Sequence, residues 1–178
     1  MAYSNYIIDF TLTEYLIVTE PVSLAEAKAY IRVSSTVDDA QIQVMIKQAR
    51  EAVETATGLT FVPKTVSLWF NNIDGNFEIP FGPVAKASFQ LFDESDNEIT
   101  NFRLIGEFHP KLTYPNRAIL KATYSAGYIT NILPNDLKIA ILDQVSYDYE
   151  NRGLDADTGI CNKTWKACQR WTRISPIL

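Results

Sequence analysis

The sequence has little of what metal-dependent and redox proteins use. It contains one histidine, His109, and two cysteines, Cys161 and Cys168, among 178 residues. A single histidine excludes a His-His metal pair and the H-E-x-x-H zinc helix. The cysteines are seven residues apart, which matches no C-x-x-C zinc spacing, and one pair of thiols makes no disulfide framework. We therefore expect no metal, no cofactor and a reducing compartment.

Glycine and long apolar runs are scarce as well. The seven glycines are scattered, so the sequence contains neither a P-loop nor a dinucleotide fingerprint, and no G-x-S-x-G surrounds a serine. The N-terminus has no basic segment followed by an apolar one, and no apolar run approaches the roughly 18 residues of a membrane span. These absences predict a soluble, intracellular protein with no membrane partner and no catalytic residues.

Positive charge is in the minority and unevenly placed. Lys and Arg number 16 against 21 Asp and Glu, a net charge of −5. Because phosphate neutralisation dominates nucleic-acid binding, we expect only transient contact with DNA. The last acid is Asp157, so residues 1–157 carry −9 and the tail carries +4.

The basic tail has two interpretations. Its four cations are spaced by 3, 4 and 3 residues, which draws one stripe along a helix. Such a stripe is either a solvated face with cations near a helix C-terminus or a docking surface, since Arg and Trp are enriched in interface hot spots. The candidate docking residues are Lys163, Trp165, Lys166, Arg170, Trp171 and Arg173.

Two helices are predicted near the N-terminus. Ser23 and Glu26 form an S-x-x-E capping box, which predicts a helix over about 23–33. An apolar period of 3.6 residues predicts a second helix over about 38–57, capped by Asp38 or Asp39 and ended by Gly58. With their short linker, the two helices are expected to form an antiparallel hairpin.

A β insertion is predicted over about 62–128, where proline, glycine and short alternating runs concentrate. Val66, Leu68 and Phe70 alternate with polar residues or tryptophan, residues 87–100 predict a hairpin, and residues 119–124 predict a further strand. The acidic turn of the hairpin lacks the glycine and glutamate of an EF-hand loop, which favours a solvated turn.

Helical sequence returns after this insertion. A helix is predicted over about 135–152, with Asn135 as its cap, and a shorter one follows from Asn162 to about Ile174. The predicted class is α+β, mainly α: a helical bundle of the N-terminal hairpin and C-terminal helices, with an inserted small antiparallel β-sheet. We divide the chain into an extended arm (1–20), a central domain (21–158) and a C-terminal docking segment (159–178).

Several segments in order resemble a known family over about residues 19–153. They are EPVSLAEAKAYIRV, DDAQIQVMIKQAREAVETATGLTF, IPFGPVAKASFQLFDESDNEIT, ATYSAGY and LPNDLKIAILDQVSYDYENRG. The chain resembles the head-tail connector proteins of tailed bacteriophages, also called adaptor or head-completion proteins. The Y-x-A-G-Y at Tyr124–Tyr128 and the Y-E-N-R at Tyr149–Arg152 are the most specific parts.

The resemblance implies a structural protein rather than an enzyme. It implies a homo-oligomeric ring, commonly of 12 copies, in the virion neck beneath the portal protein. Such a ring completes the head after packaging, carries the next stopper or tail protein, and lets double-stranded DNA pass without binding it. The resemblance also implies that the C-terminal segment reaches the portal and that the protein is made in the bacterial host cytoplasm.

Two alternatives stay open at this point. One is another neck component, such as a stopper or tail-completion protein. The other is a small metal-dependent enzyme that processes nucleic acid and uses Asp136, Asp143 and Asp148 as ligands. Only Asp136 and Asp143 share a helix face, two turns apart, and no histidine supports them.

Overall fold

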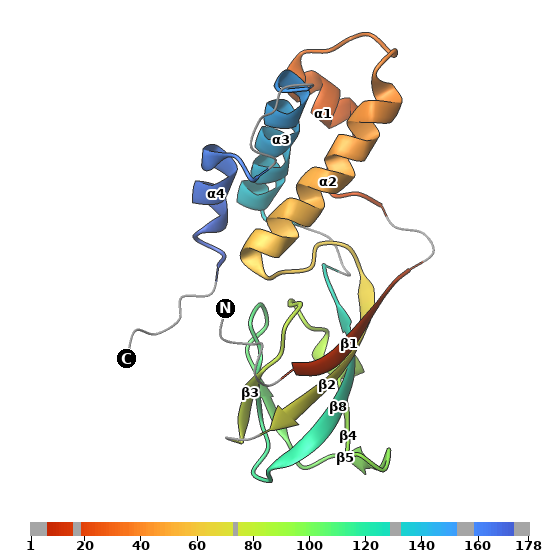
Figure 1. The fold of residues 1–178 in the computed structure, drawn as a ribbon, viewed down its shortest axis with the longest axis vertical. Helices are drawn as coiled ribbons and strands as arrows, with labels where there is room; N and C mark the ends of the chain where they lie inside the picture. The colour runs from red at the N-terminus through yellow and green to blue at the C-terminus, as the bar shows by residue number, and fades with distance from the viewer. Residues whose placement is uncertain (1–6, 16–18, 73–74, 129–132, 153–158, 173–178) are drawn as a thin grey trace. The chain divides into compact units, whose positions relative to one another are not determined.

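The computed structural model describes residues 7–15, 19–72, 75–128, 133–152 and 159–172. The chain forms two compact units (Figure 1). The sheet unit comprises residues 1–18 and 62–131, and the helical unit comprises residues 19–61 and 132–178.

The described residues correct the predicted fold class. They contain four α-helices and eight strands and are 35% helical and 28% strand, so the chain is not a mainly helical bundle with a small inserted sheet. The prediction was wrong because five of the eight strands are only two or three residues long, and two of these, β3 and β4, pair with strands far along the chain. Such strands are too short to show the alternation by which a strand is recognised in a sequence.

The sheet unit is built from two antiparallel sheets. The larger sheet has the order β1-β2-β8-β4-β5, and the smaller has the order β3-β7-β6. The larger sheet consists of β1 (Ile7–Glu14), β2 (Lys64–Asn72), β8 (Ala118–Ala126), β4 (Gln90–Phe92) and β5 (Glu98–Ile99). The smaller consists of β3 (Asn76–Glu78), β7 (Lys111–Thr113) and β6 (Arg103–Ile105), and a 3₁₀ turn, η1, covers Lys86–Ser88.

The core of the sheet unit forms from the inward residues of both sheets. Val66, Leu68 and Phe70 of β2 are fully buried, which confirms their predicted alternation. The ring of Phe70 stacks on that of Phe77 from β3, with centroids 4.1 Å apart, and so joins the two sheets. The predicted hairpin is also present, because β4 pairs with β5.

One close backbone approach in this unit requires glycine. A Cβ atom on Gly82 would lie 1.8 Å from the carbonyl oxygen of Phe108. The neighbouring hydrogen bonds hold these segments together, since Val84 N donates to the Glu107 carbonyl and Ile79 N to the Pro110 carbonyl. Residues 79–84 are thereby fixed against residues 107–110.

The helical unit contains α1 (Leu24–Ile31), α2 (Asp39–Thr57), α3 (Asn135–Glu150) and α4 (Asn162–Cys168). The capping box at Ser23 and Glu26 is confirmed, and Gly58 ends α2 in the left-handed conformation as predicted. Asp38, one of the two predicted residues, is the N-cap of α2, although its side chain bonds no helix amide. The cap of α3 differs from the prediction, because Pro134 and not Asn135 is its N-cap.

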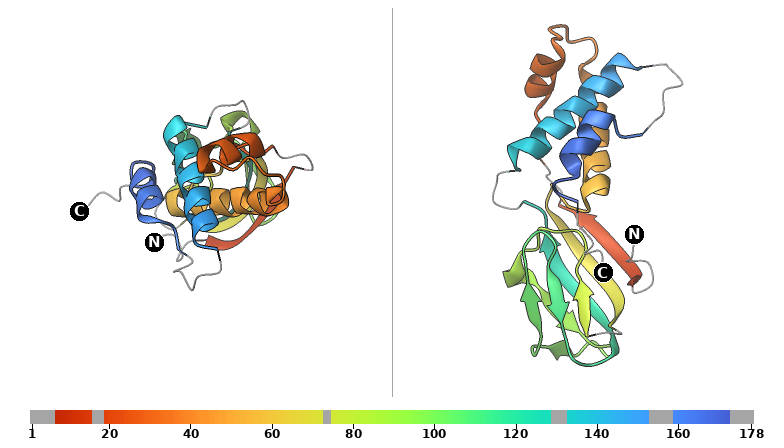
Figure 2. Two further views of the ribbon diagram at one scale, coloured as in Figure 1. Left: turned by 90° about the horizontal axis from the view of Figure 1, so that it is seen from above. Right: turned by 90° about the vertical axis from the view of Figure 1, so that its left-hand side faces the viewer.

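The core of the helical unit lies between the facing sides of its helices. α2 packs against α1 and α3, and α4 packs against α3 and α2 (Figure 2). The buried apolar residues include Ala27, Ile42, Ile46, Ala49, Val53, Leu137, Ile141, Val145 and Cys168. The predicted end of the third helix at Gly153 lies outside the described residues.

The capping box gives a pH-dependent contribution to stability. Lys138 and Ser23 bond the Glu26 carboxylate and lower its pKa to about 2. A lowered pKa in the folded state means that this contribution is complete above the unfolded pKa of about 4.3 and is lost as the pH falls toward 2. Because Glu26 is well exposed, we expect Glu26→Gln to reduce the free energy of unfolding by less than about 1 kcal/mol at pH 7.

The measurement is urea unfolding of the wild type and of Glu26→Gln at pH 7 and at pH 2.5. The difference between the two proteins should shrink at the lower pH. A difference that is equal at both pH values would show that the charge of Glu26 does not stabilise the helix start.

Candidate partner-binding surface

The predicted basic stripe lies on and just after α4, in the helical unit. Two of its cations have partners on α3. Lys163 Nζ lies 2.5 Å from Asp143 Oδ1, and Arg170 Nη1 lies 3.1 Å from Asp136 Oδ2. The two ion pairs join the start and the end of the α4 region to α3.

The Lys163 ion pair belongs to a small network around one buried carboxylate, Asp143. Asp143 is nearly inaccessible and accepts a second hydrogen bond from the hydroxyl of Tyr30 on α1, at 2.5 Å. The hydrogen bond to this carboxylate raises the pKa of Tyr30 and also that of Lys163. This part of the stripe is therefore in contact with the rest of the bundle through Asp143.

The other stripe residues are differently placed. Lys166 is exposed and forms no ion pair with any described residue. Trp165 is 42% exposed, whereas Trp171 is half-buried. Arg173 lies outside the described residues. Lys166 and Trp165 are thus the side chains of the predicted set that are most accessible to a partner.

α4 is itself part of the folded unit. Thr164 and Cys168 are buried, and the Thr164 hydroxyl donates to the carbonyl of Ala140 on α3. The sulfur of Cys161 accepts from Thr164 N at the start of the helix. Burial raises the pKa of the Cys168 thiol to about 11, so this thiol stays protonated. Only the outer face of α4 is therefore accessible from outside the helical unit.

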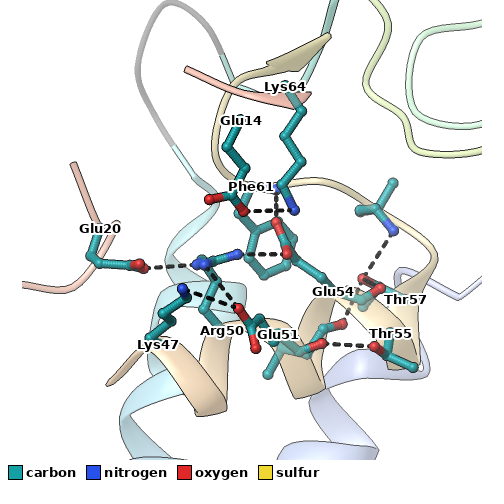
Figure 3. A network of polar contacts seen from close by, with 12 residues as sticks. Glu14, Glu20, Lys47, Arg50, Glu51, Glu54, Thr55, Thr57, Phe61 and Lys64 are labelled. Carbon is teal, nitrogen blue, oxygen red and sulfur yellow. Dashed lines mark hydrogen bonds and ion pairs between the residues drawn. The ribbon is translucent and has the colours of Figure 1, made fainter. Parts of the chain in front are cut away.

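A buried charged network elsewhere in this unit was not predicted from the sequence (Figure 3). Arg50 of α2 is fully buried and contacts three carboxylates: Glu20 at 2.8 Å, Glu54 at 2.7 Å and Glu51 at 3.5 Å. Glu54 also accepts a hydrogen bond from Phe61 N at 2.5 Å. The network holds the segments before α1 and after α2 against one helix residue.

The carboxylates of the enzymatic alternative are used in other contacts. Asp136 and Asp143 bind Arg170 and Lys163, and Asp148 accepts a hydrogen bond from Gln144. Burial raises the pKa of Asp148. Among the described residues, no three His, Cys, Asp or Glu side chains converge as metal ligands.

None of the helices in the described ranges has the length and apolar character needed to cross a membrane.

Part of the chain matches a known protein family. Residues 21–106 match the family described as "Phage gp6-like head-tail connector protein". The match confirms the relationship to the head-tail connector proteins that the sequence indicated. No curated protein matches the sequence.

Solved structures with a similar fold come from gene transfer agent (GTA) particles. A chain from the neck of an empty GTA particle, computed with C6 symmetry, is 19% identical with a TM-score of 0.72, and the match covers 93% of this chain and 96% of that one. A chain from the virion of a native GTA particle is 19% identical with a TM-score of 0.71, and the match covers 93% of this chain and 96% of that one. A chain from the neck of a native GTA particle, computed with C12 symmetry, is 18% identical with a TM-score of 0.63. That match covers 90% of this chain and 97% of the other. The likeness shows that both units have the fold of these chains.

Proposed function

We propose that this chain is a structural component of a phage-type particle neck, where its copies form a ring at the head-tail junction. The observation that carries the proposal is the family match over residues 21–106, extended by a fold that covers at least 90% of chains from particle necks. The family description names a head-tail connector, and two of the similar chains come from necks with sixfold or twelvefold symmetry.

In this proposal the ring has 12 copies and lies beneath the portal protein. It completes the head after DNA packaging and offers the platform for the next stopper or tail protein. A chain with net charge −5 suits a channel for DNA, because an acidic wall does not trap phosphate groups. Double-stranded DNA can then pass during ejection without binding.

The proposed portal contact uses the outer face of the C-terminal segment. Lys166 and Trp165 are exposed there, next to the exposed ion-paired side chains of Lys163 and Arg170. A tryptophan beside unpaired positive charge has the composition of an interface hot spot. A partner surface with apolar pockets and carboxylates would be complementary to it.

A double substitution tests this contact. Lys166→Glu with Trp165→Ser changes two exposed side chains, so we expect the free energy of unfolding to stay within about 0.5 kcal/mol of wild type. Portal affinity, measured by biolayer interferometry, should fall at least about tenfold, since each hot-spot residue contributes more than about 1 kcal/mol.

The matched control is Lys86→Glu, which reverses one exposed lysine of the sheet unit. We expect it to leave portal affinity unchanged. Full portal affinity in the Lys166 and Trp165 variant would overturn the assignment of this surface. Lys163→Glu is unsuitable as a probe, because it would place a second carboxylate beside buried Asp143.

A further inference from the structure

The strand β1 forms an open edge of the larger sheet. It hydrogen-bonds to β2 along one side and is the terminal strand in the sheet order (Figure 1). All its residues after Ile7 are exposed, although the sequence IIDFTLTE alternates like that of a half-buried strand. An eight-residue edge strand with apolar side chains is a template for protein association, which proteins cover or protect.

The apolar side chains of β1 lie on the core-facing side of the larger sheet but are less buried than those of β2. Phe10 and Leu12 pair in register with the buried residues Leu68 and Val66. They nevertheless remain 49% and 37% exposed. The same face that is fully buried on β2 is therefore partly open to solvent on β1.

The residue that packs on Phe10, Phe81, has an unusual backbone conformation. The ring of Phe81 packs against that of Phe10, with centroids 5.3 Å apart. Phe81 has φ +58°, a conformation that costs free energy for a residue with a side chain and that recurs at functional sites. The chain thus adopts a strained conformation where two partly exposed phenylalanines meet.

The charge around β1 defines the chemistry of its partner. Asp9, at the edge of the sheet on the opposite strand face, forms no ion pair with any described residue, and Glu14 lies on the same strand face as Phe10 and Leu12, where Lys64 is its partner. These acids disfavour nucleic acid, because phosphates would be repelled. A complementary surface combines exposed apolar area with cations.

The smaller sheet presents such a surface on its outer face. Arg103 and Ile105 alternate with inward Leu104 on β6, and Lys111 on β7 pairs in register with Ile105. Ile105 is 50% exposed, and neither cation forms an ion pair within the described ranges. We call Arg103, Ile105 and Lys111 the basic sheet face.

We propose that the β1 edge of one copy packs against the basic sheet face of a second copy. This inference rests on the proposed ring, and it names the surfaces by which neighbouring subunits meet. A ring needs a head-to-tail contact between two different, complementary surfaces of the same chain. The sheet unit carries both: an acidic apolar edge and a basic face with an exposed isoleucine.

A cross-linking experiment tests the contact directly. One protein carries Leu12→Cys and a larger tag, the other carries Ile105→Cys, and both contain Cys161→Ser, which keeps a hydrogen-bond acceptor at the α4 cap. Mass photometry first establishes whether the mixed copies associate. A short bismaleimide should then give a cross-linked pair of mixed mass, and each single variant alone should give at most a trace.

Two negative results have different meanings. Copies that do not associate would overturn both the ring and this contact. Copies that associate without a mixed cross-linked pair would overturn the contact and leave the ring standing.

Substitution of the apolar side chains gives a second test. Phe10→Ser with Leu12→Ser should weaken self-association about 30-fold or more, since two apolar side chains no longer become buried. The control, Thr11→Ser with Thr13→Ser, changes the opposite face of the same strand and should leave association unchanged. Circular dichroism checks that both variants fold. Unchanged association of the folded Phe10 and Leu12 variant would contradict the proposal.

Discussion

Replacing Arg50 by methionine should lower the free energy of unfolding by about 3–5 kcal/mol, the usual cost of removing one partner from a buried ion pair. Arg50 is fully buried, and Glu54 is nearly so. Without the guanidinium group, the Glu54 carboxylate would lose its 2.7 Å ion pair while staying nearly buried. A buried carboxylate that has lost its cation is the costly product of this substitution.

Urea unfolding followed by circular dichroism at 222 nm measures the effect on the helical unit. Lys47→Met is the matched control, because Lys47 lies on the same helix and forms an exposed ion pair with Glu51 at 4.0 Å. We expect it to change stability by less than about 0.5 kcal/mol. Equal small effects of the two substitutions would mean that the Arg50 network contributes little to stability.

Phe70→Ala should destabilise the sheet unit by about 3–5 kcal/mol, the range for truncating a buried phenylalanine. Phe70 is fully buried on β2, and its ring stacks on Phe77 of the smaller sheet. Truncation would leave a cavity where the two sheets meet, and the stacking contact would be lost. The effect should therefore be near the upper end of this range.

Tryptophan fluorescence during urea unfolding provides the measurement, since Trp69 lies on the neighbouring position of β2. Thr65→Ala on the same strand is the control, because Thr65 is exposed, and it should change stability by no more than about 0.5 kcal/mol. A loss below about 1 kcal/mol for Phe70→Ala would show that the two sheets do not share one packed core.

Local signals were read correctly from the sequence, because the interactions that produce them are also local. Ser23 and Glu26 are three residues apart, and the side chain of each hydrogen-bonds the backbone of the other. Gly58 supplies the left-handed conformation after α2. The alternation of apolar residues in β2 correctly predicted which of its side chains are buried. At α3, Asn135 was wrongly assigned as the cap because the preceding proline occupies that position instead.

Long-range pairings could not be read in the same way. The strands β3, β6 and β7 are three residues each, and their pairing depends on partners elsewhere in the chain. Residues 7–14 were interpreted as part of an extended arm, and the structure pairs them with β2, 50 or more residues away. The sheet was therefore judged too small and the helical part too dominant.

The candidate site was predictable only in part. The periodicity of the tail placed its cations on one stripe, but periodicity does not say which cation has an acid opposite it. The structure gives Lys163 and Arg170 partners on α3, whereas Lys166 has none among the described residues. One sequence signal could have predicted the buried network of Arg50. This arginine follows Ala49 of the apolar stripe of α2, and Glu54 lies four residues later, on the same side of the helix.

The most direct test of the proposed function is electron microscopy of purified particles in which this chain carries a tag labelled with gold. The proposal predicts a label at the head-tail junction of each particle and, after averaging, a ring of rotational symmetry in the neck. A label on the capsid surface or along the tail, or particles with a complete neck and no label, would contradict the assignment of this chain to the neck.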